Sequence, residues 1–314
     1  MRLKYTSEDF PAGSILNGVN ELTLTWDEII WAALTVGRPP THFSPSHGLP
    51  YLREGTFRIS LVYMALEQYG PTAFRLRRTE AFKNLDPTEK GAISYFLGMT
   101  FCKLFASRLL DSPWLLHVDV YKDAFGAASL GRSRPDLFGQ QVGTGNWFAF
   151  EAKGRSTKPS AADRAKAKAQ AVRLVSVGGT PTSMHIGSFA FFASDALQFH
   201  WIDPRSDTAR PLELPPVGER WRYYYEPIRS LWAGETDDDG AAQGELQIEL
   251  ANFDVKIRVH KLLAPAFLLR TWEEARRVML RQHRQVVADG FHADGLKVEC
   301  GASWAQRRPR QEAS

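Results

Sequence analysis

Apolar positions recur at helical spacing through most of residues 1–85. Thr25 and Glu28 form the pattern of a capping box at the start of one apolar helix, and Gly37 is a natural end for it. The stretch 53–70 repeats the same spacing and again ends at a glycine. The pattern therefore predicts a helical N-terminal region over residues 1–85.

The longest helical candidate follows at residues 86–110. Asp86 can cap this helix, Pro87 suits its first position, and Glu89 is the third residue after the cap. Apolar side chains occupy much of the helix circumference, which is typical of a helix that is buried on most sides. We therefore expect this helix to lie in the centre of the fold.

The next hundred or so residues, on the scale of one small domain, predict an α/β unit. Four apolar runs bounded by turn residues are typical of strands: 113–122, 134–142, 146–154 and 183–194. Residues 160–177 have high helix propensity and are followed by two glycines. The order helix, three strands, helix, strand predicts a sheet flanked by helices between residues 86 and 203, which makes the chain an α/β protein.

Residues 204–314 predict an α+β C-terminal extension. Apolar and polar positions alternate on both sides of residues 251–252, which indicates a hairpin with one buried face. Thr271 and Glu274 have the spacing of a capping box at the start of a basic helix, which Gly290 ends. The polar tail beyond is expected to be disordered.

Composition indicates an ordinary soluble protein with a slight excess of positive charge. A 44% hydrophobic content with 24% charged residues is usual for a globular chain, and 314 residues allow two domains or one core with large extensions. The net charge of +4 is compatible with a polyanionic partner. Two cysteines, no apolar leader and no apolar run of membrane-spanning length predict a cytoplasmic protein without a membrane partner.

The strand at 146–154 ends in opposite charges rather than in turn residues. Glu151 and Lys153 lie two residues apart, so their side chains share one face of the strand. Asp136, at the start of the preceding strand, reaches the same end of the sheet if the two strands pair. The connection between them is rich in Gly and Asn, which permits such a reversal.

Two carboxylates beside an ammonium group suit phosphodiester hydrolysis. Mg²⁺ is commonly held by one or two protein carboxylates together with water and phosphate oxygens. Such a metal polarises the phosphodiester and makes a nucleophilic water available near neutral pH. A neighbouring lysine can orient that water and offset charge that grows on the phosphate. The alternative is a surface strand end with a structural ion pair.

The residues Pro135, Asp136, Glu151, Ala152 and Lys153 resemble the signature of the PD-(D/E)XK nuclease superfamily, the restriction-endonuclease-like fold. The resemblance implies that Asp136 and Glu151 bind a divalent metal, Mg²⁺ or Mn²⁺, and that Lys153 assists the attacking water. The family core is also helix, three strands, helix, strand. The resemblance covers the central part of the chain and leaves both flanks unplaced.

Two further site candidates follow from the resemblance. Many members of the superfamily place an acid on the first core helix, and Glu89 is the matching residue, although its capping position explains it equally well. In the exonuclease-like branch a glutamine on the helix after the lysine supports the site, and Gln170 is the candidate for that role. Leu174 stands where that branch has a tyrosine, which is a departure from its pattern.

A basic flank follows the candidate catalytic strand. Between residues 153 and 173 a single acid, Asp163, stands among seven basic residues. Such a flank can neutralise a phosphate backbone without reading its sequence, although a solvated helix face is the commoner role of a charge run. The nucleic-acid-binding candidates among them are Arg155, Lys158, Arg164, Lys166 and Lys168.

The leading interpretation is a Mg²⁺-dependent deoxyribonuclease of restriction-like type, with defence against foreign DNA as the setting that the resemblance implies. A homodimer, or a partner subunit of a defence system, would fit that setting. The alternatives are a catalytically silent nuclease-fold binding protein, a repair nuclease and an RNA-directed nuclease. The sequence does not separate DNA from RNA as the substrate.

Overall fold

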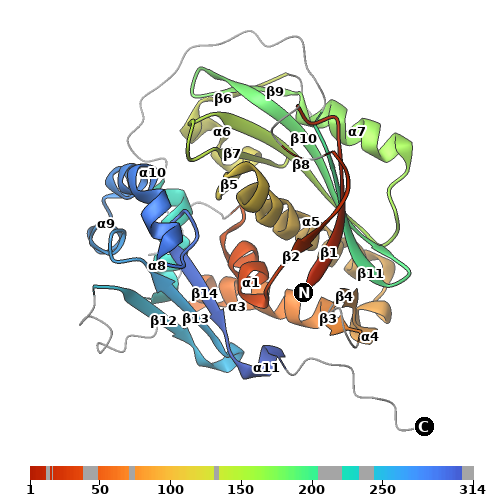
Figure 1. Ribbon diagram of the computed structural model, residues 1–314, viewed down its shortest axis with the longest axis horizontal. Coiled ribbons are helices and arrows are strands. Elements are labelled where there is room, and N and C mark those ends of the chain that lie inside the picture. Colours follow the sequence, from red (N-terminus) through yellow and green to blue (C-terminus); the bar gives the residue numbers. More distant parts are fainter. Residues whose placement is uncertain are drawn as a thin grey trace.

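A mixed β-sheet forms the centre of the fold (Figure 1). Its main strands run in the order β2 (Gly18–Thr23), β1 (Arg2–Glu8), β11 (Ala196–Ile202), β10 (Thr180–Ala193), β8 (Trp147–Arg155), β7 (Leu137–Gln140) and β5 (Trp114–His117). Two short pairs extend it, β3 (Leu66–Tyr69) with β4 (Arg75–Arg78) beside β11, and β6 (Ala127–Ser129) with β9 (Leu174–Val177) beside β10. This computed structural model describes residues 1–11, 15, 17–37, 49–70, 75–130, 134–203, 221–232 and 244–305.

Helices pack on this sheet and join it to a second, smaller sheet. The described helices are α1 (Trp26–Thr35), α3 (Leu49–Ala65), α4 (Glu80–Lys83), α5 (Pro87–Leu110), α6 (Val118–Phe125), α7 (Ala161–Ala171), α8 (Arg222–Trp232), α9 (Ala264–Leu269), α10 (Trp272–Ala288) and α11 (Ala302–Ala305). The second sheet is antiparallel and consists of β12 (Leu246–Leu250), β13 (Val255–Val259) and β14 (Leu296–Cys300). In Figure 1, α1 lies between α5 and this smaller sheet.

The predicted α/β class is confirmed. After α5, the strands β5, β7 and β8 pair as antiparallel neighbours, and α7 then leads to β10, which pairs in parallel with β8. Helix α5 lies on the face of the sheet to which Gly154 of β8 points, whereas α7 packs on the face of Gly187 in β10. The sheet is therefore covered on both sides where β8 and β10 meet.

Helix α5 is the central helix that the sequence predicts. It begins in the expected capping box, in which Asp86 accepts from the backbone N–H groups of Thr88 and Glu89. Among the described residues, this helix alone is long and apolar enough to cross a membrane, but 72% of its apolar stretch is buried inside the protein. That burial is typical of the core helix of a soluble protein.

Glycines allow α5 to lie directly on β8. A Cβ atom added to Gly154 would come within 1.5 Å of the carbonyl oxygen of Ser94, and one added to Gly98 would come within 2.5 Å of the backbone nitrogen of Gly154. No side chain fits between the two backbones at this point. The contact therefore determines where the carboxyl end of β8, with Glu151 and Lys153, lies relative to α5.

The prediction of a helical N-terminal region over 1–85 is wrong for its first part. Residues Arg2–Glu8 form β1, in which alternate side chains are buried, and β1 pairs in parallel with β11. The stretch after Gly70 holds β4 before the short helix α4. The period-two pattern of these short strands is weak by itself, and pairing with distant strands decides their structure.

Two segments of the predicted core also differ. The first strand ends at His117, because Val118, Tyr121 and Phe125 are buried at helical spacing and form α6. The predicted helix at 160–177 ends at Ala171, and β9 follows. Gly178 and Gly179 both have positive φ angles, so they form the turn of a hairpin between β9 and β10 rather than a helix end.

The C-terminal extension has the predicted α+β character. The expected hairpin is confirmed as β12 and β13, which pair in antiparallel register on both sides of residues 251–253. The basic helix is α10, but the predicted capping box is wrong, because the side chain of Thr271 makes no cap hydrogen bond and Glu274 pairs with Arg277 at 2.6 Å. The tail at 306–314 lies outside the described residues.

A buried ionic network joins the core helix to the C-terminal extension. Lys103 of α5 is fully buried, and its Nζ donates to the hydroxyl of Tyr224 at 2.6 Å. That hydroxyl donates to Oδ2 of Asp294 at 2.5 Å, and Trp31 Nε1 donates to the same oxygen at 3.1 Å. Burial lowers the pKa of Lys103 to about 7 and raises the pKa of Asp294. The network thus connects α1, α5, α8 and the loop before β14.

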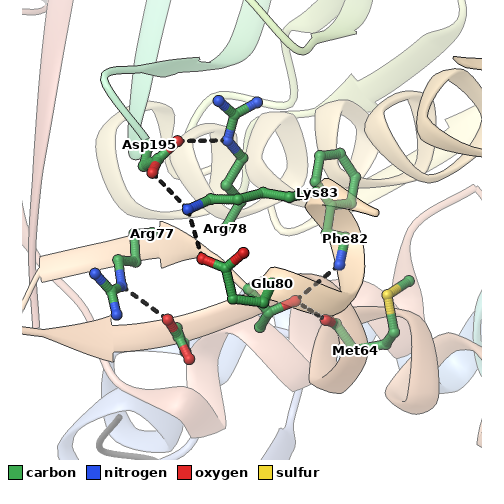
Figure 2. Close-up of polar contacts among 9 residues, drawn as sticks. Met64, Arg77, Arg78, Glu80, Phe82, Lys83 and Asp195 are labelled. Atoms are coloured by element: carbon green, nitrogen blue, oxygen red, sulfur yellow. Dashed lines mark hydrogen bonds and ion pairs between the residues drawn. The ribbon is translucent and has the colours of Figure 1, made fainter. Parts of the chain in front are cut away.

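A second, partly buried set of ion pairs holds the turn between β10 and β11. Asp195 has a positive φ angle and accepts from Arg78 Nε and Lys83 Nζ, each at 2.7 Å. Figure 2 shows these contacts, with Lys83 also directed toward Glu80 and Arg77 paired with the acid of β3. Arg78 of β4 and Lys83 of α4 therefore connect this turn to the N-terminal region through ion pairs.

The contact between α5 and β8 predicts a strong position effect for alanine substitution. We expect Gly154→Ala to lower the free energy of unfolding by about 1–3 kcal/mol or more, because its methyl group cannot be accommodated. Gly91→Ala is the matched control, since no atom lies within 4 Å of its added Cβ, and it should stabilise α5 by up to about 1 kcal/mol. Urea unfolding measures both, and equal effects would contradict the close contact.

The buried network predicts a large loss of stability when only one of its two charged partners is removed. We expect Lys103→Met to lower the free energy of unfolding by about 3–5 kcal/mol, because Asp294 is left as a buried acid without its cation. The double variant Lys103→Met with Asp294→Asn should recover part of that loss. Additive losses in the double variant, measured by urea unfolding, would show that the two groups are not coupled.

Candidate active site

The three residues of the predicted catalytic set lie together at the carboxyl end of β8. The antiparallel register pairs Leu137 with Phe150, which places Asp136 opposite Glu151. Oδ2 of Asp136 accepts the backbone N–H of Ala152 at 2.9 Å and lies 3.6 Å from Nζ of Lys153. The same Nζ forms an ion pair with Oε1 of Glu151. Both carboxylates therefore contact one ammonium group.

Burial differs sharply among these three side chains. The Glu151 side chain is 1% exposed, whereas those of Asp136 and Lys153 are 19% and 29% exposed. Burial, and then the charge of Asp136, raise the pKa of Glu151 to about 7 against the opposing effect of Lys153. Burial also raises the pKa of Asp136, while Lys153 and the N–H of Ala152 lower it. The site therefore concentrates negative charge where it is poorly solvated.

The donor set fits a hard divalent cation. Oε2 of Glu151 is buried and, among the described residues, no donor meets it at standard hydrogen-bond geometry. The described part of the chain holds no cluster of three or more His, Cys, Asp and Glu side chains with metal-site spacing. Among the described residues, protein side chains alone therefore do not complete the coordination of a metal ion. Asp136 and Glu151 could hold Mg²⁺ or Mn²⁺, because such ions retain water and take phosphate oxygens as further ligands.

A cleft of about 340 Å³ opens beside Lys153. Gln170 of α7, a predicted site residue, lines this cleft, as does Tyr95 of α5. Gly154 and Ala167 form part of the wall, while Arg155, Asp163 and Lys166 supply charged groups. Gln170 and Lys153 therefore line the same cleft, and a supporting role of Gln170 in the site stays a prediction.

Glu89 occupies the capping position rather than the cleft. Its carboxylate accepts the backbone N–H of Asp86 at 3.2 Å, and its side chain is exposed. It lies six positions before Tyr95, which corresponds to about 9 Å along the helix axis. The capping interpretation of Glu89 is thus confirmed, and a role in metal binding stays a prediction.

The basic flank divides into paired and exposed groups. Arg155 pairs with Asp163 at 2.6 Å, and Lys168 pairs with Asp9 at 2.8 Å. Arg164 NH1 donates to the carbonyl of Pro159 at 3.4 Å. The remaining two candidates, Lys158 and Lys166, are exposed. Since Lys166 and Arg155 also line the cleft, they are the basic groups placed to meet an anion beside Lys153.

Tyr95 is the cleft residue that sequence reasoning missed. The sequence marks it only as an aromatic residue in an apolar helix, beside the core residues of α5. It is 45% exposed, and its pKa is raised to about 12 by burial and by the charges of Asp136 and Glu151. Its place in the site depends on α5 crossing β8, for which the sequence carries no local signal.

The buried carboxylate of Glu151 predicts a pH-dependent effect on stability. Its folded pKa of about 7 lies above its usual value of 4.5, so the folded state holds this proton more tightly than the unfolded state. In metal-free buffer with chelator, wild type should lose stability relative to Glu151→Gln as the pH rises from about 4.5 through 7. We expect the melting temperature of Glu151→Gln to exceed that of wild type by roughly 2–5 °C above pH 7.5.

Calorimetric scans at pH 5 and pH 8 measure this difference. A difference that stays constant between the two pH values would show that Glu151 is not held with a raised pKa. Adding Mg²⁺ or Mn²⁺ at pH 8 should stabilise wild type but not Glu151→Gln, because a ligand that binds only the folded state raises its stability.

Comparisons with protein-family models, with curated proteins and with solved structures gave no match for this chain. Its function is therefore inferred from the geometry and chemistry of the site at the end of β8.

Proposed function

We propose that this protein is a Mg²⁺-dependent nuclease that hydrolyses phosphodiester bonds in DNA. The observation that carries the proposal is the convergence of Asp136, Glu151 and Lys153, in which two carboxylates from adjoining strands meet one ammonium group. An ordinary strand end has no reason to bury a carboxylate to 1% exposure beside a second acid. A cation that binds both acids would offset this cost.

The order of elements supports a restriction-endonuclease-like core. Helix α5, the antiparallel strands β5, β7 and β8, helix α7 and the parallel strand β10 follow one another in the order that the resemblance implies. Helix α6 and strand β6 are inserted after the first core strand, and β9 precedes the last. In this interpretation β1, β2 and β11 extend the sheet beyond the core.

Each residue of the site has a role in this mechanism. Asp136 and Glu151 would hold the metal, and the bound ion would supply Lewis acidity toward the phosphate and a nucleophilic water near neutral pH. Lys153, which contacts both acids, would orient the attacking water and offset the charge that develops on the phosphate. Arg155 and Lys166, which line the cleft beside Lys153, would attract the phosphate backbone.

The biological setting follows from the resemblance. A cytoplasmic nuclease that acts on foreign DNA is the setting we propose, with DNA repair as the alternative, and a second copy or a partner subunit would supply the cut on the other strand. A catalytically silent binding protein is the rival proposal. The site favours the nuclease over this rival, because two carboxylates converge on one ammonium group and the Glu151 side chain is 1% exposed.

Cleavage assays test the proposal. We expect metal-dependent cutting of plasmid or linear DNA by wild type and a loss of about 100-fold or more in Asp136→Ala and Lys153→Ala, since each removes a group that acts in the transition state. Lys256→Ala is the matched control, because it removes a lysine on the smaller sheet, paired with Glu249, and should cut normally.

Metal binding provides a second readout that does not require the correct substrate. Isothermal titration with Mn²⁺ at pH 8 should give one site in wild type and no measurable binding in Asp136→Ala with Glu151→Gln. Cleavage that is indifferent to Asp136 and Lys153, or Mn²⁺ binding that is unchanged in the double variant, would refute the nuclease proposal.

A further inference from the structure

The cleft beside Lys153 combines an aromatic ring with cationic groups. Tyr95 reaches it from α5, and Lys153, Arg155 and Lys166 reach it from β8 and α7. Gln170 also lines the cleft. Cations beside an aromatic ring are the combination that binds phosphates and base faces of a nucleic-acid strand.

The positions of the Tyr95 ring and of the acids determine how a nucleic-acid strand would lie in the cleft. Tyr95 and Lys153 line the same cleft, so the ring lies at the end of the cleft that adjoins the acids. Lys153 belongs both to the acid cluster and to the cleft wall. A strand whose scissile phosphate lies at Lys153 therefore places its neighbouring nucleotide against Tyr95.

The size and concave shape of the cleft favour an unpaired nucleotide over one that is stacked in a duplex. A volume of about 340 Å³ is near the lower limit of small-molecule sites and is comparable with a single nucleotide. A base inside a duplex has both faces stacked on its neighbours and presents only its edges. A ring inside a concave cleft can therefore contact a base face only after the base has left the stack.

We infer that Tyr95 stacks on an unpaired base next to the scissile phosphate, so that the cleft takes single-stranded nucleic acid in preference to continuous duplex. The inference rests on the proposed nuclease function and narrows its substrate class. The phenol stays neutral at physiological pH, so it adds no repulsion to the phosphates that Arg155 and Lys166 attract. Tyr95 thereby acts as a specificity-determining residue.

Equilibrium binding in chelator separates recognition from cleavage. Fluorescence anisotropy would compare a labelled pyrimidine-rich single strand with its own duplex, at the same length and salt concentration. We expect wild type to bind the single strand at least about 5-fold more tightly, because only the single strand offers an unstacked base face to the ring. Tyr95→Ala should weaken binding of the single strand by about 5- to 150-fold and leave duplex binding within about 2-fold.

Three control variants make the result specific to the ring. Tyr95→Phe keeps the aromatic face and should bind the single strand within about 3-fold of wild type. Tyr63→Ala removes a ring of similar exposure, 46%, on α3 and away from the cleft, and should not change the ratio of the two affinities. Lys166→Ala should weaken both substrates alike, since a phosphate contact does not distinguish them.

The outcomes distinguish this inference from the nuclease proposal. Equal binding of single strand and duplex by wild type, or equal losses for both substrates in Tyr95→Ala, would overturn the inference even if metal-dependent cleavage is observed. If the ratio of single-strand to duplex affinity depends on Tyr95, and cleavage depends on Asp136 and Lys153, the result would support both the stacking role of Tyr95 and the nuclease function. A ratio that depends on Tyr95 without any metal-dependent cleavage would overturn the nuclease function and with it the placement of the base beside a scissile phosphate.

Discussion

The direct contact between the backbones of α5 and β8 is the constraint on which the rest of the structure depends. Gly98 and Gly154 let the helix approach the strand so closely that no side chain separates them. Because α5 is buried along most of its length, this contact positions the whole central sheet relative to the helix. It also brings Tyr95, which extends from α5, to the end of β8 where the acids lie. Fold and candidate site thus share one packing contact.

The network around Lys103 shows how the C-terminal extension is attached to this centre. An amine and a carboxylate that are both fully buried lose their hydration, and they are tolerated only with close partners. The partners come from α1, α8 and the loop before β14, so they form only when the extension is docked. A hydrophobic contact of the same area would tolerate sliding, whereas these hydrogen bonds define one arrangement.

The two buried acids of the candidate site lower the stability of the fold. Glu151 is buried beside Asp136, and Lys153 compensates both acids only in part, since the pKa values of both acids remain raised. Ionisable groups with strongly shifted pKa values cluster at functional sites, and a bound cation would offset the cost of burying these two acids. The exposed lysines of the basic flank carry no comparable cost, and their contribution would be to attract a polyanion over a distance.

The sequence by itself determined the α/β class, the central helix with its capping box, and the set formed by Asp136, Glu151 and Lys153. These follow from local rules, namely hydrophobic period, cap chemistry and alternation along one strand, and the pairing of β7 with β8 requires only a short connection. The parallel pairing of β1 with β11, the partners of Lys103 and the approach of Tyr95 to Gln170 were decided by tertiary structure alone. They join residues far apart in the chain, and only the packing of the whole core determines which distant segments become neighbours.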